Sequence, residues 1–176
     1  MMTTEESFKK VLAECRAMFE MKMHDYGTSW RVLRPSSITD QIFIKASRIR
    51  NIQEKQVQKV DEGVRSEFVA IVNYSIMAII QLELPQNEEW DLSSEKALAL
   101  YDNYAEKAFQ LMNNKNHDYG EAWRQMRISS ITDIILQKIM RVKQIENNEE
   151  KLLASEGLAA NYYDMLNYAV FVLIRI

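Results

Sequence analysis

The sequence predicts an all-α protein, a six-helix bundle made of two three-helix repeats related by a pseudo-two-fold axis. The first observation behind this prediction is an internal repeat: residues 24–52 and 117–145 are identical at 16 of 29 positions, at a constant offset of 93. The second is that apolar residues recur at helical spacing along both copies. The third is that the 176 residues include only four glycines and two prolines, which leaves little material for turns.

The first helix has clear start and stop signals. Thr3 and Glu6 have the spacing of a capping box, and a helical stripe of apolar residues follows. We expect this helix to end near Met23, where the sequence His-Asp-Tyr-Gly begins. Gly27 is then well placed as the left-handed residue that terminates it. The first helix of repeat two is expected to be capped by Ser93 or Ser94 and to be ended by the sequence His-Asp-Tyr-Gly at 117–120.

The second and third helices of each repeat follow from similar signals. Ser37 and Ser130 are predicted to cap the second helices, with Asp40 and Asp133 as the acids three residues on. The third helices, after Gly63 and Gly157, are apolar almost all round, so we expect them to be central and buried. The predicted organisation is a single domain over 1–176, with repeat one at 1–84, a linker at 85–92 and repeat two at 93–176.

Composition limits what the protein does. The net charge is −3 and there is no basic run, so direct nucleic-acid binding is not expected. A single cysteine, Cys15, excludes an internal disulfide. The N-terminus lacks the apolar core of a signal peptide, and the apolar stretch 162–176 is too short to span a bilayer. We expect a cytoplasmic protein without a membrane partner, either a monomer that imitates a dimer internally or a dimer of such monomers.

The repeated loop, of the pattern HDYG-x-x-WR, is the first candidate site. Its carboxylate and imidazole suit a metal or phosphate, its tyrosine and tryptophan suit a stacked base, and its arginine suits phosphate. The alternative is a helix C-cap whose aromatic residues pack as a plug. The candidate nucleotide-binding residues of these loops are His24, Asp25, Tyr26, Trp30, Arg31, His117, Tyr119, Trp123 and Arg124, with Asp118 a candidate metal ligand and catalytic residue.

The second helices each carry a Lys-x-x-Arg pair, Lys45 with Arg48 and Lys138 with Arg141. Residues three apart share one helix face, so each pair is a candidate phosphate clamp. Solvated surface charge is the alternative.

The last helix places polar residues on one face of an otherwise apolar cylinder. These residues are Glu156, Asn161, Asp164 and Asn167. Buried carboxylates need cations as partners, either a metal or side chains; a salt bridge from Asp164 to Lys138 or Arg141 is the structural alternative. In repeat one, Glu67 stands at the position of Asn161 and Ala70 at that of Asp164, so we expect the two sites to differ.

These motifs resemble the first family of nucleotide modification associated domains, present here in tandem. The shared features are the K-x-H-D-Y-G-x-x-W loop, the S-S-I-T-D helix start, the K-x-x-R pair and the helix E-G…N-x-x-D-x-x-N-Y. The resemblance implies a role in nucleotide metabolism or base modification. The helical build with an acidic last helix is also distantly similar to MazG-like nucleoside triphosphate pyrophosphohydrolases. The E-x-x-E magnesium pair of those enzymes is missing from the first helices here, and Asn161-x-x-Asp164 and Glu67-x-x-Ala70 each match half of their second pair, E-x-x-D.

Two main hypotheses follow. In the first, the protein is a Mg²⁺-dependent nucleotide pyrophosphohydrolase, with Asp118, Glu156 and Asp164 as catalytic and metal-binding residues and Glu67 as a further metal ligand. In the second, it is a non-catalytic nucleotide-binding module. A purely structural helical adaptor is a weaker alternative. A His-Asp phosphohydrolase is disfavoured, because the chain contains only two histidines.

Overall fold

The computed structural model describes residues 1–55, 63–84, 90–148 and 157–176. Over these ranges the chain is helical and contains no strand, which confirms the all-α prediction. The elements in order are α1 (Thr4–Tyr26), the 3₁₀ helix η1 (Ser29–Val32), α2 (Pro35–Lys55), α3 (Val64–Glu83), α4 (Ser94–Tyr119), the 3₁₀ helix η2 (Ala122–Gln125), α5 (Ile128–Asn147) and α6 (Leu158–Arg175).

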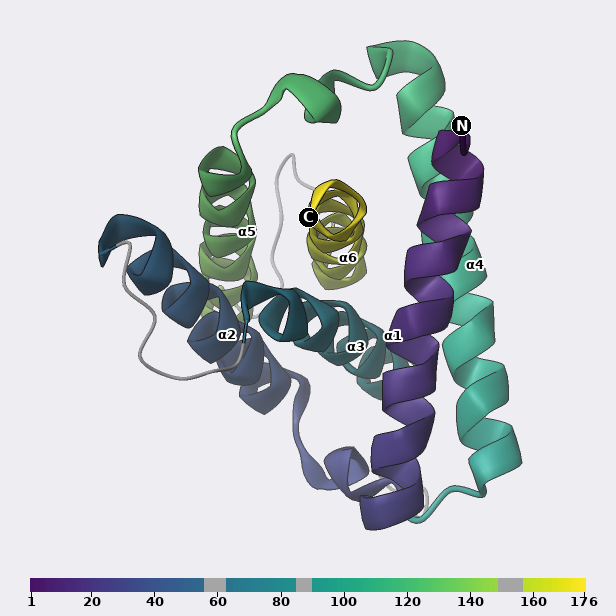
Figure 1. The fold of residues 1–176 in the computed structure, drawn as a ribbon. Coiled ribbons are helices and arrows are strands. Elements are labelled where there is room, and N and C mark those ends of the chain that lie inside the picture. The colour runs from purple at the N-terminus through teal and green to yellow at the C-terminus, as the bar shows by residue number, and fades with distance from the viewer. Residues whose placement is uncertain (56–62, 85–89, 149–156) are drawn as a thin grey trace.

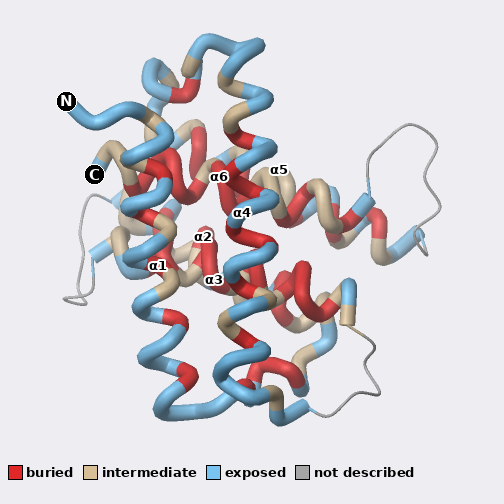
Figure 2. Tube along the Cα trace, turned by 90° about the vertical axis from the view of Figure 1, so that its right-hand side faces the viewer, coloured by how far each residue is buried: buried red, intermediate tan, exposed pale blue. Residues whose placement is uncertain are grey.

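Equivalent helices of the two repeats lie next to each other. Figure 1 shows α1 beside α4 on one side, α2 beside α5 on the other, and α3 with α6 between them. The third helices pack against each other at the centre, as the apolar pattern predicts, and Figure 2 shows burial concentrated on them and on the inward faces of α1 and α4. The two halves therefore share one core.

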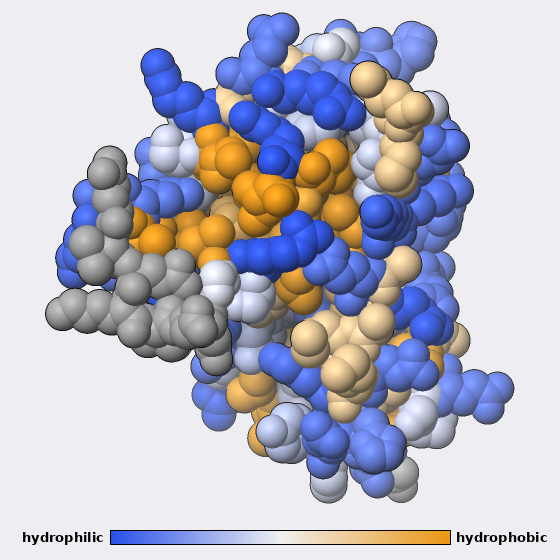
Figure 3. Space-filling view, viewed as in Figure 1, coloured by the Kyte–Doolittle hydropathy of each residue, from blue (hydrophilic) through white to orange (hydrophobic). Residues whose placement is uncertain are grey.

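Apolar side chains also reach the surface. On the face shown in Figure 3 they gather where the end of α6 lies near α3 and α5, surrounded by polar side chains. By length and composition α3 could cross a membrane, but 67% of the relevant window is buried inside the protein. Its apolar character is that of a core helix.

The helix starts differ in part from the prediction. Thr3 and Ser93 do cap α1 and α4, accepting hydrogen bonds from the backbone of Glu6 and Lys96. The prediction for the second helices was wrong: α2 begins at Pro35 and α5 at Ile128, so Ser37 and Ser130 lie inside the first turns. Proline is favoured in a first turn because the backbone N–H that it lacks would have no intrahelical acceptor there.

The first helices are longer than predicted. α1 continues through the loop motif to Tyr26, and α4 to Tyr119. Gly27 and Gly120 then take positive φ values of 60° and 58°, as predicted for the residues that end these helices. His24 and Asp25 are therefore the last helical turn rather than a loop.

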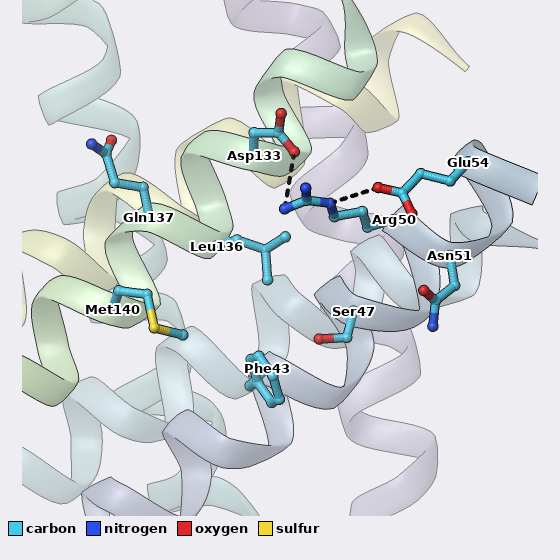
Figure 4. A pocket seen from close by; sticks show the side chains of 9 residues that line it. All are labelled: Phe43, Ser47, Arg50, Asn51, Glu54, Asp133, Leu136, Gln137 and Met140. Carbon is cyan, nitrogen blue, oxygen red and sulfur yellow. Dashed lines mark hydrogen bonds and ion pairs between the residues drawn. The ribbon is translucent and has the colours of Figure 1, made fainter.

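Acids expected to cap helices instead join the two repeats. Arg50 of α2 lies 3.8 Å from Asp133 of α5, and Lys143 of α5 lies 3.4 Å from Asp40 of α2. The four residues are related by the repeat offset, so the two ion pairs are reciprocal, as a two-fold relation between the repeats requires. Figure 4 shows the first pair above an open groove of about 410 Å³ lined by Phe43, Leu136 and Met140, with Ser47, Asn51, Glu54 and Gln137 around it.

A matched asparagine ties each third helix to the first helix of its own repeat. Asn73 donates from Nδ2 to the Cys15 carbonyl at 3.0 Å, and Asn167 donates to the Ala108 carbonyl at 3.2 Å. The side-chain amide oxygens of the two asparagines differ in their hydrogen-bond partners. Oδ1 of Asn73 accepts from the Tyr101 hydroxyl at 2.8 Å, whereas Oδ1 of Asn167 has no partner in the described part of the chain.

Replacing Tyr101 with phenylalanine should lower the free energy of unfolding by about 1–2 kcal/mol, because a buried amide oxygen loses its donor. Tyr101 is 1% exposed, and burial raises the pKa of its phenol well above the ordinary value. Urea denaturation measures the change. Tyr104→Phe is the matched control, since the Tyr104 hydroxyl makes no hydrogen bond to a described residue. An equal loss of unfolding free energy in Tyr101→Phe and Tyr104→Phe would contradict the stabilising role of the hydrogen bond from Tyr101 to Asn73.

Candidate functional site

Two cavities lie at equivalent positions in the two repeats, beneath the repeated loops. The repeat-two cavity, of about 330 Å³, is lined by Met112, Lys115, Asn116, Tyr119, Ala122, Trp123, Met126, Lys138, Asp164, Asn167, Tyr168 and Phe171. The repeat-one cavity, of about 360 Å³, is lined by Phe19, Lys22, Met23, Tyr26, Gly27, Ser29, Trp30, Leu33, Tyr74 and Met77. Figure 1 shows the adjoining segments η1 and η2 at opposite ends of the α1–α4 pair.

Each loop is anchored by the last turn of its own third helix. In repeat two, Nη1 of Arg175 donates to the carbonyls of Trp123 and Met126 at 3.1 and 2.6 Å. In repeat one, Nε2 of Gln81 donates to the carbonyls of Arg31 and Leu33 at 2.8 and 2.5 Å. The carbonyls of Leu33 and Met126 are equivalent, whereas those of Arg31 and Trp123 are one position out of register, so two different side chains anchor the loops in nearly the same way and hold the cavity wall relative to the core.

The tryptophan of the repeat-two loop is structural. Trp123 is 4% exposed and stacks on Phe171, with ring centroids 4.3 Å apart and an interplanar angle of 5°. The Arg124 guanidinium lies over the same indole at 4.4 Å. With both faces of the ring occupied, Trp123 packs as a plug and has no face left on which a base could stack.

The charges of the repeat-two cavity converge on one carboxylate. Nζ of Lys115, from α4, lies 2.8 Å from Oδ1 of Asp164, and Nζ of Lys138, from α5, lies 2.9 Å from Oδ2. The side chains of Lys138 and Asp164 are 15% and 19% exposed. The predicted structural alternative, a salt bridge from Asp164 to Lys138, is therefore present. Lys115, Lys138 and Asp164 together give this part of the cavity wall a net charge of +1.

Two tyrosines complete this cavity. Tyr119 is 73% exposed, and Tyr168 of α6 is partly buried. Burial raises the pKa of Tyr168, and the nearby Asp164 carboxylate raises it further, so its hydroxyl stays protonated as a donor. These rings, unlike Trp123, offer surface to a ligand.

The corresponding charges of repeat one are arranged differently. Glu67 is 3% exposed and is bound by Arg48, with Nη1 3.1 Å from Oε1, and by Lys45, with Nζ 3.7 Å from Oε2. Neither cation lines the repeat-one cavity. Because Ala70 replaces the acid, Lys22 is the one charged side chain among the described residues that line that cavity.

Other predicted residues lie apart from these clusters. Four of them are exposed: His24, Asp25, His117 and Asp118. Nδ1 of each histidine lies near the carboxylate of its neighbouring aspartate, at 3.4 and 3.3 Å. Arg31 is buried and donates to Gln81, and Arg141 is exposed. Nδ2 of Asn161 donates to the Gly157 carbonyl. Glu156 lies outside the described residues.

The described residues do not fit the expected magnesium site. Asp164 and Glu67 are each engaged by two cationic side chains, and Asp118 does not line the cavity. In the ranges that the structure covers, no three His, Cys, Asp or Glu side chains form a group able to hold a metal ion.

Sequence reasoning assigned no role to Lys115 and Tyr168, which line the repeat-two cavity. Both carried a signal: Lys115 begins the K-x-H-D-Y-G-x-x-W motif, Tyr168 ends the N-x-x-D-x-x-N-Y motif, and each is matched in the other repeat, by Lys22 and Tyr74.

A protein-family model described as nucleotide modification associated domain 1 matches the chain twice, over residues 22–82 and residues 115–176. The two matches begin at the cavity lysines, Lys22 and Lys115, and cover both repeats. No curated protein and no solved structure matches the chain. The tandem family resemblance is therefore confirmed, whereas the distant similarity to MazG-like enzymes finds no support.

Proposed function

The chain belongs to the nucleotide modification associated domain 1 family, and from that premise we propose that it binds a nucleotide in the repeat-two cavity. The observation that carries the proposal is the convergence of Lys115 and Lys138, from two helices, on Asp164 within a cavity that two tyrosines line. The lysines receive the phosphate, and the rings of Tyr119 and Tyr168 receive the base.

The electrostatics of the cavity support an anionic ligand. An ammonium group has three N–H donors, and Asp164 uses one from Lys138. A phosphate oxygen that accepts another gains a charge-assisted hydrogen bond in a partly desolvated site, where such bonds are stronger than in water. Asp164 holds the two lysine side chains in place before the ligand arrives, which reduces the entropy lost on binding.

The proposal is for binding rather than hydrolysis. Hydrolysis at Asp118, Glu156 and Asp164 requires these acids to share a metal, but two lysines already pair with Asp164, and Asp118 is exposed outside the cavity. Incubation of the protein with nucleoside triphosphates and Mg²⁺, followed by chromatography of the products, tests this distinction. Release of pyrophosphate or phosphate by the wild-type protein would overturn the binding-only proposal.

Calorimetric titration of the protein with the common nucleotides tests binding itself. Lys138→Gln should weaken binding by about 10- to 100-fold, because a charge-assisted hydrogen bond is worth about 1.5–3 kcal/mol. The matched control is Lys45→Gln, which changes the equivalent lysine of repeat one. Lys45 contacts Glu67 instead of a cavity, so its loss should leave nucleotide affinity unchanged. Equal affinity in the wild-type protein and the Lys138 variant would contradict the proposal.

A further inference from the structure

The two cavities share one part of their lining. Both contain a lysine, two tyrosines and a buried tryptophan at positions related by the repeat: Lys22 and Lys115, Tyr26 and Tyr119, Trp30 and Trp123, Tyr74 and Tyr168. Tyr26 is 69% exposed and Tyr119 is 73% exposed, so the same aromatic surface is open in both. A shared aromatic wall indicates that the two cavities take the same flat part of a ligand.

The charged part of the lining is not shared. In repeat two, Lys138 and Asp164 join Lys115 in the wall. In repeat one, Ala70 removes the acid, and Lys45 is held by the buried Glu67 outside the cavity. The rest of the repeat-one wall is mostly apolar, with Phe19, Met23, Leu33 and Met77.

We propose that the repeat-one cavity is a second binding site whose ligand is a nucleoside, bound through its base without help from a phosphate. The proposal rests on the proposed function, since it assigns the shared wall to the base. An exposed Lys22 alone is a poor phosphate site, because a solvated ammonium contributes little net affinity. An apolar, aromatic cavity of about 360 Å³ is instead typical of small ring ligands.

An unsatisfied donor in each shared wall adds to this argument. Nε1 of Trp30 is buried and, like Nε1 of the matched Trp123, has no acceptor among the residues that the structure describes. An unpaired buried N–H costs about 1–3 kcal/mol. A base carbonyl that displaced the atoms shielding this N–H would recover part of that cost. The opposite placement of η1 and η2 in Figure 1 allows both sites to be filled at once.

The test is calorimetric titration with adenosine, guanosine, cytidine and thymidine, and with their 5′-monophosphates. In the full-length Lys138→Gln protein, the preferred nucleoside and its monophosphate should bind with affinities within about threefold of each other. Tyr26→Ala should weaken nucleoside binding by about tenfold or more, because base stacking is worth about 1–3 kcal/mol. Ile44→Ala is the control: Ile44 is an exposed residue of α2 that lines neither cavity, so its loss should leave that binding unchanged.

Three results would overturn the second site: no nucleoside binding to the wild-type protein, equal binding by Tyr26→Ala, or a clear preference for the monophosphate in Lys138→Gln. Failure of the proposed function looks different. In that case nucleosides bind in a Tyr26-dependent manner, but Lys138→Gln leaves monophosphate affinity unchanged. Tyr26 and Ile44 are both largely exposed, so neither variant should lose its fold.

Discussion

Replacing Asp164 with asparagine should tighten the binding of a nucleoside monophosphate by about tenfold. In the free protein the carboxylate neutralises one of two lysines, and a phosphate must share those lysines with it. Asparagine keeps the shape but raises the net charge of the cavity wall from +1 to +2. One added charge a few ångströms from a phosphate is worth about 1–4 kcal/mol at the dielectric constants of water and of protein surfaces.

This result is the opposite of what a metal ligand would give. If Asp164 held Mg²⁺, its loss would weaken nucleotide binding, as the hydrolase hypothesis from sequence requires. Calorimetry at low ionic strength makes the comparison, and the gain should shrink as salt screens the charges. Asp133→Asn is the control, because it makes the same change in net charge at the α2–α5 seam, away from both cavities. Weaker binding by Asp164→Asn would contradict the assignment of Lys115 and Lys138 as the residues that bind the phosphate.

Replacing Arg48 with methionine should lower the free energy of unfolding by about 2–3 kcal/mol. The Glu67 side chain is 5% exposed. Without Arg48, the contact that its carboxylate keeps among the described residues is the longer one, to Lys45. Removing one partner of a buried ion pair costs about 3–5 kcal/mol, and the partial exposure of Arg48 reduces that figure. Urea denaturation followed by circular dichroism measures the change.

Two further variants define this prediction. Arg141→Met alters the matched arginine of repeat two, where Asn161 replaces the glutamate, and should change stability by less than about 0.5 kcal/mol. The double variant Arg48→Met/Glu67→Gln should recover more than half of the loss, because no buried charge is then left without its partner. Additive losses in the double variant would show that Arg48 stabilises the fold independently of Glu67.

The internal repeat determined most of the architecture from sequence. Matched glycines after α1 and α4, and third helices that are apolar almost all round, left few arrangements other than two three-helix units that bury those helices together. Such features are local, since helical period, caps and burial follow from residues a few positions apart. The ends were predicted less well: α1 and α4 extend through the loop motif because an Asp-Tyr pair does not itself break a helix.

Tertiary structure decided the roles of the polar residues. Asp40 and Asp133 have the spacing of caps but pair with cations of the opposite repeat, a contact that no local pattern encodes. Trp123 was a plausible stacking platform until Phe171 and Arg124 were placed against its two faces. Lys115 and Asp164 lie 49 residues apart, and they meet because α6 packs beside α4 and α5. The sequence could name the charges, but the electrostatic partner of each one depends on helix packing, which is set by the whole core.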